Sequence, residues 1–281
     1  MDKMKAMSDI LVTTSWAEQN LKTEGLRFVE VDVDTSSYQK GHISGAVGWN
    51  WKEQLQDVLT RNVASTVAIE KLLGQSGIDK DTTIILYGDN NNWFSAWAYW
   101  LLKYYGHQNL KILDGGRLKW IAEGRDLTTE VPTPKVTEYQ IDHIYEEYRA
   151  MRDDVVQTIN DSQPYGLVDV RSPDEFTGKI IAPPGMTELS QRGGHIPGAK
   201  NIPWASTVNE DGTFKSKEEL TNLYVSHGIT PDKPIIAYCR IGERSAHSWF
   251  VLKELLEYDD VRNYDGSWTE WGNLINAPIE R

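Results

Sequence analysis

Residues 41–46 read Gly-His-Ile-Ser-Gly-Ala, and residues 194–199 read Gly-His-Ile-Pro-Gly-Ala. Three further matches between the two halves are Tyr87 with Tyr238, Asp114 with Asp265 and Trp120 with Trp271. The positions in each of these pairs differ by the same amount, since 238 − 87, 265 − 114 and 271 − 120 all equal 151. Solenoid repeats are much shorter, roughly 20–50 residues. The long period therefore indicates a duplicated domain.

Short apolar runs alternate with helical patterns in both halves. The runs are residues 29–33, 84–87, 167–170 and 235–238. Apart from Glu30 and Asp32 in the first run and Asp169 in the third, their residues are apolar, which is typical of strands in a parallel sheet that is buried on both faces. Helical periodicity follows two of the runs, over residues 93–105 and 245–258. The sequence therefore predicts an α/β fold with two similar domains, each a mainly parallel sheet covered by helices on both faces.

The seam between the halves is expected within residues 127–145. Pro132 and Pro134 stand there among threonine, glutamate and lysine, a composition that is typical of an extended connector. We therefore place the first domain at residues 1–130 and the second at residues 131–281.

Composition excludes several classes of function. The chain has 281 residues, of which 40% are hydrophobic and 25% charged, and its formal net charge is −12. This acidity argues against nucleic acid or an anionic membrane surface as a partner. No stretch approaches the roughly 20 apolar residues of a membrane span, and the first residues lack the apolar core of a signal peptide. We therefore expect a cytoplasmic protein with neither nucleic-acid nor membrane partners.

Cys239 is the only cysteine in the chain. Alone it forms no internal disulfide and no cysteine-rich metal site, so it is either a small buried apolar residue or a functional thiol. It lies between the run 235–238 and a predicted helix, where a loop directs backbone N–H groups inward as an anion cradle. Arg240 and Arg244 add positive charge, and Gly242 permits a tight loop. We therefore expect a functional thiolate whose pKa is lowered from the usual cysteine value.

Residues 239–245 read Cys-Arg-Ile-Gly-Glu-Arg-Ser, which resembles the active-site loop of the thiosulfate-type rhodaneses. The resemblance covers nearly the whole chain. It includes Leu-Val-Asp-Val-Arg at 167–171, Gly-His-Ile-Pro-Gly-Ala at 194–199 and Asp-Gly-Ser followed by Trp271. An active cysteine in the second half alone is also the tandem arrangement of that family. The resemblance thus implies two rhodanese-like domains, of which the second is catalytic.

The resemblance implies a sulfurtransferase that works by double displacement. The Cys239 thiolate would attack the outer sulfur of thiosulfate, release sulfite and retain the sulfur as a persulfide. Cyanide, a thiol or a protein cysteine would then accept that sulfur. The implied partners are a small anionic sulfur donor and a thiol or cyanide acceptor, and the chemistry requires no metal and no organic cofactor.

The substrate-binding candidates that the resemblance implies are Arg244, Arg240 and Arg192. Their guanidinium groups suit the oxyanion end of the substrate. The chain departs from the family pattern at Glu175, where some thiosulfate enzymes have an arginine.

Four other residues are candidates for support of the loop. Asp169 and Arg171 are expected to form a strand-end pair that braces it, while Gly242 and Ser245 belong to the loop itself and the start of its helix.

The histidines and the first-half loop are expected to have other roles. His195 has a counterpart, His42, in the half without a cysteine, so a turn or packing role is predicted for it. His247 has no counterpart and is a candidate for tuning the thiolate. In the first half, either Gly88 or Asp89 falls at the position of Cys239, depending on a one-residue gap, and neither is a nucleophile for this chemistry.

Three other functions fit parts of the sequence. A mercaptopyruvate sulfurtransferase would share the fold and nucleophile, but a charged loop favours an inorganic oxyanion. A cysteine phosphatase would have five residues between cysteine and arginine, whereas four separate Cys239 from Arg244. A non-catalytic rhodanese-like binding module would not need the intact loop. Thiosulfate is therefore the favoured donor, with mercaptopyruvate as the alternative.

Overall fold

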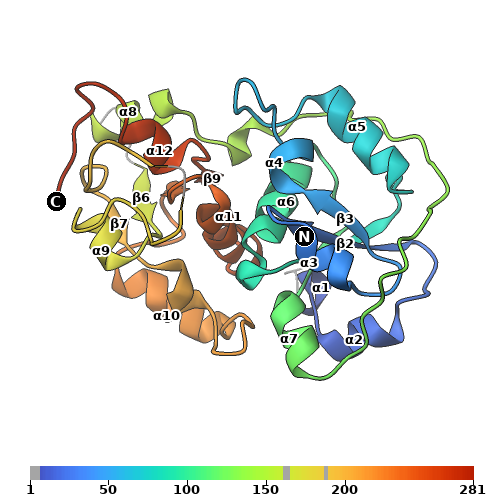
Figure 1. Cartoon of the computed structure of the whole chain (residues 1–281). Helices are drawn as coiled ribbons and strands as arrows, with labels where there is room; N and C mark the ends of the chain where they lie inside the picture. Colours follow the sequence, from blue (N-terminus) through green and yellow to red (C-terminus); the bar gives the residue numbers. More distant parts are fainter. Residues whose placement is uncertain (1–6, 161–164, 187–188) are drawn as a thin grey trace. The chain divides into compact units, whose positions relative to one another are not determined.

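The computed structural model describes residues 7–160, 165–186 and 189–281. The chain divides into two compact units (Figure 1). The first extends to Tyr145 and includes residues 210–213, and the second comprises residues 146–209 and 214–281. Each unit is an α/β structure with a parallel sheet, which confirms the predicted fold class. Within the described residues, no helix is long and apolar enough to cross a membrane.

The sheet of the first unit is parallel throughout and has the strand order β1-β5-β4-β2-β3. Its strands are β1 (Leu11–Val12), β2 (Leu26–Asp32), β3 (Val47–Asn50), β4 (Thr83–Tyr87) and β5 (Leu110–Leu113). In the register of the sheet, Val29 lies opposite Leu86 on one side and Val47 on the other. The central strands are therefore buried, as the apolar sequence of β4 predicts, and β2 also buries the charged residues Glu30 and Asp32.

Helices cover both faces of this sheet. The helices are α1 (Met7–Ile10), α2 (Thr14–Gln19), α3 (Ser36–Lys40), α4 (Trp51–Gln54), α5 (Thr66–Gln75), η1 (Asn90–Asn92), α6 (Trp93–Tyr104) and α7 (Gly116–Ala122). Helix α6 packs on β2, β4 and β5 and is buried along nearly its whole length, including Trp97 and Trp100. The opposite face packs against α2 and α7 through Ala17 and Trp120.

The sheet of the second unit has the order β7-β6-β8-β9 and is also parallel. Its strands are β6 (Gly166–Asp169), β7 (Lys200–Asn201), β8 (Ile235–Tyr238) and β9 (Val261–Asn263). Strand β8 is central, with Asp169 of β6 opposite Tyr238. Because β8 ends at Tyr238, the next residue, Cys239, lies at the carboxyl edge of the sheet, where ligands of such folds bind.

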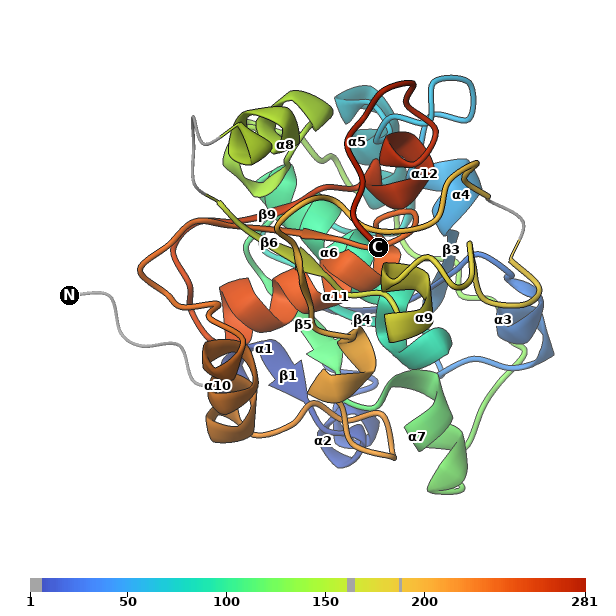
Figure 2. The same cartoon turned by 90° about the vertical axis from the view of Figure 1, so that its left-hand side faces the viewer.

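The helices of the second unit also cover both faces of its sheet. They are η2 (Glu146–Tyr148), α8 (Arg152–Ile159), α9 (Pro173–Phe176), η3 (Trp204–Thr207), α10 (Lys217–Ser226), α11 (Glu243–Phe250), its π-helical continuation η4 (Val251–Leu255) and α12 (Ser267–Trp271). Helices α8 and α12 lie on one face of the sheet (Figure 1, Figure 2), where Val155 and Trp271 join the core. Helix α11 packs against β8 and β9 and is buried along its length.

Hydrogen bonds show how the two sheets correspond. The hydroxyl of Tyr87 accepts a bond from the N–H of Ile43, and that of Tyr238 accepts one from the N–H of Ile196, both at 3.1 Å. The carbonyl of Gly88 accepts from the N–H of Arg117, and the carbonyl of Cys239 accepts from the N–H of Trp268, again at 3.1 Å. Gly88, and not Asp89, therefore occupies the position of Cys239.

Candidate functional site

The loop that holds Cys239 is short and tightly packed. It joins β8 to α11, and Gly242 immediately precedes the helix with a φ of 100°. A Cβ atom on Gly242 would lie only 2.8 Å from the Cα of Asp265. Glycine is required there because both the backbone angle and the space exclude a side chain. Cys239 itself is fully buried.

Three groups surround the sulfur of Cys239. The N–H of Gly242 donates to Sγ at 3.1 Å, and the hydroxyl of Ser245 lies 3.7 Å away. The thiol in turn donates to Oε2 of Glu243 at 3.3 Å. The N–H of Cys239 is held by Oγ of Ser267 at 3.1 Å. One inward N–H group of the predicted anion cradle is thus present, but a carboxylate stands beside it.

The electrostatic expectation for Cys239 was wrong. Burial raises the pKa of Cys239, and the negative charge of Glu243 raises it further. The positive charge of Arg244 and hydrogen bonds from Ser245 oppose these effects but do not outweigh them. The arginines and N–H groups of the loop favour a lowered pKa, but desolvation and the Glu243 carboxylate act in the opposite direction.

Arg244 and Glu175 form a buried, two-pronged ion pair. Nη1 and Nη2 of Arg244 each donate to one carboxylate oxygen of Glu175 at 3.0 Å. The same carboxylate accepts from the N–H of Ser172 and caps α9. Burial favours a raised pKa for Glu175, but the hydrogen bonds and charge of Arg244 leave that pKa below its usual value. Nε of Arg244 also lies 3.6 Å from Oε1 of Glu243.

The other two predicted substrate ligands have different surroundings. Arg240 is buried, and its Nη2 donates to Sδ of Met186 at 3.2 Å. The guanidinium of Arg192 donates to four backbone carbonyls near the C-terminus, those of Trp271, Gly272, Leu274 and Ala277. Arg192 therefore holds the turn that follows α12, whereas Arg240 and Arg244 belong to the loop and its helix.

The predicted supporting residues lie around the same strand ends. Nε of Arg171 donates to Oδ1 of Asp169 at 3.0 Å, and Nη2 donates to Oδ2 at 2.6 Å and to the carbonyl of Gly194 at 2.7 Å. The guanidinium also lies over the ring of Trp268, 4.5 Å from its centroid. Oγ of Ser245 lies 2.7 Å from Oδ1 of Asn263 and so links α11 to β9.

The corresponding loop of the first unit is closed to a nucleophile. A Cβ atom on Gly88 would lie 2.5 Å from the carbonyl oxygen of Val31 and 2.9 Å from Oγ of Ser95. The loop is one residue longer than its counterpart, and Asn90, Asn91 and Asn92 all have left-handed backbone angles, with φ of 51°, 53° and 62°. The loop of the first unit therefore differs from the Cys239 loop in packing and in backbone shape, as well as in its lack of a cysteine.

Both halves of the chain match the rhodanese-like domain, over residues 13–123 and 151–274. This chain belongs to the rhodanese family. The match agrees with the two parallel-sheet units and with the repeated Gly-His-Ile motif, so the family resemblance stated from the sequence is confirmed.

Relatives and solved structures extend this finding. A Haloferax volcanii protein named "Putative thiosulfate sulfurtransferase" is 53% identical over 97% of this chain and 96% of its own length. The sulfur carrier protein TtuD of Thermus thermophilus is 50% identical over 98% of both chains. The anaerobic ergothioneine biosynthesis enzyme of Chlorobium limicola shares the fold, with a TM-score of 0.84 and 24% identity over 100% of this chain and 72% of that one. The chain is therefore a rhodanese-family sulfurtransferase.

Two histidines have equivalent places in the two rhodanese units. Nδ1 of His195 bonds to the carbonyl of Phe176, and its ring stacks on that of Phe176 with centroids 3.5 Å apart. Nδ1 of His42 bonds to the carbonyl of Tyr38, and its ring stacks on Tyr38 at 3.8 Å. Both histidines therefore pack a turn, as their repetition in the two halves predicts.

The surroundings of His247 do not connect it to Cys239, whose thiolate it was a candidate to tune. It is fully enclosed on α11, where its ring stacks on Phe214 and meets Trp204 edge-on. Burial lowers the pKa of His247 to about 3. Within the described residues neither ring nitrogen has a hydrogen-bond partner. The ring is thus neutral at ordinary pH, and no bond links it to Cys239.

Sequence reasoning missed the role of the two acidic residues. Glu243 was counted only as part of a charged loop, and Glu175 only as a departure from the family pattern. A signal for Glu175 existed, because a buried carboxylate in place of an arginine needs a compensating cation, and Arg244 supplies it. Nothing in the sequence indicates which way the Glu243 side chain turns.

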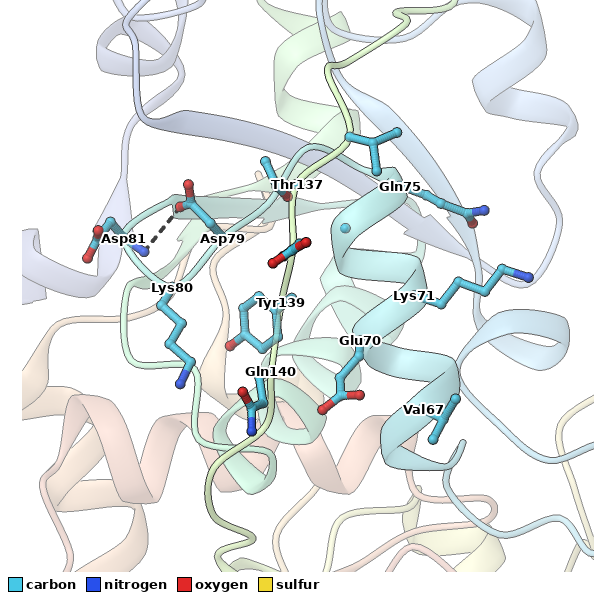
Figure 3. Close-up of a pocket in the computed structure, with 13 residues that line it drawn as sticks. Val67, Glu70, Lys71, Gln75, Asp79, Lys80, Asp81, Thr137, Tyr139 and Gln140 are labelled. Carbon is cyan, nitrogen blue, oxygen red and sulfur yellow. Dashed lines mark hydrogen bonds between the residues drawn. The ribbon is translucent and has the colours of Figure 1, made fainter.

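A separate pocket lies in the first unit, between α5 and the extended segment 136–140 (Figure 3). Its labelled side chains carry both signs of charge, with Glu70 and Lys71 on the helix and Lys80 across from them. The segment is tied to α5 by the N–H of Thr137, which donates to the carbonyl of Gly74. This pocket follows from how the connector is attached, and no cysteine is among the residues that line it.

Proposed function

We propose that this rhodanese moves the sulfane sulfur of thiosulfate to a thiophilic acceptor through a persulfide on Cys239. The observation that carries the proposal is the position of the one cysteine. It lies at the carboxyl end of β8, with an inward N–H from Gly242 at 3.1 Å and the buried cation of Arg244 on the adjoining helix. This is the arrangement that a sulfur nucleophile with an anionic substrate needs.

The reaction has two displacement steps. The sulfur of Cys239, once deprotonated, forms a bond to the outer sulfur of thiosulfate, and the sulfur–sulfur bond of thiosulfate breaks with its electron pair leaving on sulfite. A cyanide or thiolate acceptor then bonds to the outer sulfur of the persulfide, and the pair of that bond returns to Cys239. No external oxidant or reductant takes part, and we assign no metal or organic cofactor to either step.

Arg244 is the first candidate for a substrate ligand, because it lies in the first turn of the helix that follows the loop and its ion pair with Glu175 holds its charge there. Arg240 adjoins the nucleophile and is the second candidate. Arg192 is the third, because four carbonyls already accept from it. Glu175 would hold Arg244 in place, and the Asp169–Arg171 pair, Gly242 and Ser245 would hold the loop.

Two names among the relatives bear on the donor and the acceptor. Thiosulfate appears in the name of the Haloferax relative, which supports thiosulfate as donor, while the Thermus relative is named a sulfur carrier, which supports a protein cysteine as one acceptor. Mercaptopyruvate is the second candidate donor, since the buried Glu175 offsets the charge of Arg244 and weakens the case for a dianion. We place the reaction in the cytoplasm, with no membrane or nucleic-acid partner.

A phosphatase is disfavoured by the geometry of the loop. Four residues separate Cys239 from Arg244, and this loop makes a smaller cradle than the five-residue loop of a cysteine phosphatase. A purely binding role is disfavoured because such a role needs neither the thiol nor the buried cation beside it.

One assay separates these candidates. The full-length protein is supplied in parallel with thiosulfate and cyanide, with mercaptopyruvate and cyanide, and with p-nitrophenyl phosphate, and thiocyanate or nitrophenolate is measured. We expect thiocyanate from thiosulfate, and intact mass should show one added sulfur atom per chain after thiosulfate alone. Cyanide should remove that sulfur, and Cys239→Ala should neither gain it nor form thiocyanate. Activity that survives in Cys239→Ala would overturn the proposal.

A further inference from the structure

The sulfur of Cys239 and the carboxylate of Glu243 form a buried pair. Their atoms Sγ and Oε2 are 3.3 Å apart, and the two residues are 0% and 1% exposed. Glu243 is fixed as the first residue of α11, so its backbone cannot move away without unwinding the helix. The thiol is the donor in this contact, and a carboxylate oxygen of Glu243 is the acceptor.

The nearby charges leave the negative charge of Glu243 only partly balanced. Arg244 places its Nε 3.6 Å from Oε1 of Glu243, but the two Nη groups of Arg244 are already bound to Glu175. One arginine thus faces two carboxylates. Uncharged groups also act on the sulfur, namely the N–H of Gly242 and the hydroxyl of Ser245.

Other charged groups of the second unit that pack around this loop have partners of their own. Asp265, against which Gly242 packs, is bound by Arg149 at 3.0 Å, and Arg240 donates to Met186. On β6 the carboxylate of Asp169 is paired with Arg171. None of these pairs is a contact of the sulfur, so Glu243 is the anion that acts on it most directly.

We infer that Glu243 is a positioning residue that holds Cys239 as a neutral, hydrogen-bonded thiol in the resting protein, so that sulfur uptake requires loss of the thiol proton. This inference deepens the proposed function and rests on it. In the uptake step the Sγ–H bond breaks and the proton passes to solvent. Sγ then bonds to the sulfane sulfur, and sulfite leaves with the electron pair of the broken sulfur–sulfur bond. The resting thiol is thereby kept from reacting with electrophiles at neutral pH.

The test compares the pH dependence of Cys239 alkylation in the full-length protein and its Glu243 variants. Iodoacetamide reacts with the thiolate, and one cysteine per chain gives one adduct that intact mass detects. We expect the midpoint of the rate profile to fall in the order wild type, Glu243→Asp, Glu243→Gln. Glu243→Gln should lie at least about one pH unit below wild type, which is about a tenfold faster reaction at pH 7.

Controls separate this effect from net charge and from folding. Glu218→Gln removes one exposed carboxylate from the first turn of α10 and should leave the midpoint unchanged. If Glu243→Gln does not fold, Glu243→Asp carries the comparison, because it keeps the charge and moves it away from the sulfur. A midpoint equal to or above that of wild type in the Glu243 variant that folds would overturn the inference.

A second readout distinguishes failure of the inference from failure of the proposed function. Sulfur loading from thiosulfate is followed by intact mass over the same pH range, and loading of Glu243→Gln should reach its plateau at lower pH. A wild-type protein that takes up no sulfur would contradict the proposed function, while the alkylation midpoints would still decide the role of Glu243.

Discussion

Arg117 in the first unit and Arg171 in the second place their guanidinium groups at equivalent points of the fold, although they come from different elements. Arg117 binds the carboxylate of Glu30 on β2, and its Nη2 donates to the carbonyl of Gly41. Arg171 binds the carboxylate of Asp169 on β6, and its Nη2 donates to the carbonyl of Gly194. Each of these glycines is the first residue of a Gly-His-Ile motif. Arg171 comes two residues after the end of β6, whereas Arg117 lies on α7. The fold therefore preserves a cation at this point while its source in the sequence has changed.

Because the arginine of the first unit comes from α7, the position that corresponds to Arg171 is occupied by Asp32. We predict that the buried carboxylate of Asp32 destabilises the folded state. Burial, followed by the charges of Asp89 and Glu30, raises the pKa of Asp32 to about 8. The folded state thus binds a proton that the unfolded chain releases near pH 4, so stability is greatest below that pH and falls as pH rises toward 8. At pH 8, Asp32→Asn should unfold at a higher urea concentration than wild type, and its free energy of unfolding should be larger by about 1–3 kcal/mol. At pH 5 the gain in stability should be smaller.

Asn can keep the acceptor for the N–H of Asp89, which Asp32 now bonds at 3.0 Å. Asp34→Asn is the matched control, since the carboxylate of Asp34 is exposed and is not among the charges that act on Asp32. An Asp32→Asn variant no more stable than wild type at pH 8 would contradict the prediction.

A cysteine placed in the first unit should not create a second sulfur site. In Gly88→Cys the new Cβ would lie 2.5 Å from the carbonyl oxygen of Val31, a contact that backbone movement must relieve. We expect the melting temperature to fall by several degrees, since overpacking costs about 1–3 kcal/mol, and thiosulfate to load still one sulfur per chain. Gly166→Ala, where the nearest atom would be 3.4 Å away, is the control for adding a Cβ. Two labile sulfurs would show that the loop can accommodate the change.

The ion pair between Arg244 and Glu175 predicts that loss of either partner lowers stability, while the two losses change thiosulfate binding in opposite directions. Arg244→Ala leaves a buried carboxylate unpaired and should cost about 3–5 kcal/mol of stability, and the thiosulfate kcat/KM should fall about ten- to hundredfold. Glu175→Gln also destabilises, but it frees the charge of Arg244, so the KM for thiosulfate should fall.

Urea unfolding and steady-state kinetics on the same preparations measure both quantities. Since Arg244 lowers the pKa of Glu175, this part of the stability should be present above the usual glutamate pKa and be lost as pH falls below it. An unchanged KM in both variants would place the substrate site elsewhere.

His247 predicts sensitivity to acid. Burial lowers its pKa to about 3, whereas the unfolded chain binds the proton near pH 6.5. The unfolded state therefore holds more protons between these values, so stability falls by up to about 1.4 kcal/mol for each pH unit below 6.5. His247→Phe, which keeps a ring against Phe214, should lose less stability between pH 6.5 and 4 than wild type. The exposed His227 gives the control, His227→Phe, whose pH profile should match that of wild type.

Much of the fold could be predicted from the sequence because its signals are local or periodic. The duplicated motif, the apolar strands and the strand–loop–helix around Cys239 depend on residue type and spacing alone. They led to two parallel-sheet units and to a cysteine at a strand end, which the structure shows.

The electrostatics of the site could not be predicted in the same way. The pKa of Cys239 depends on burial and on the direction of the Glu243 side chain, and both are set by tertiary packing. The pairing of Arg244 with Glu175 joins residues that are 69 positions apart. Counting charges along the loop gave the wrong sign because it treated each charge as free and solvated.

The close packing of Gly88 also bears on how such a duplicated protein can evolve. Recovery of a working first half would require a new nucleophile, a shorter loop in place of three left-handed asparagines, and relief of the contact with Val31. Each change alone disrupts a packed unit without restoring chemistry, so selection has no intermediate to favour. The loss of chemistry in the first half is therefore difficult to reverse by single substitutions. We expect the first half to accept those sequence changes that preserve its own core.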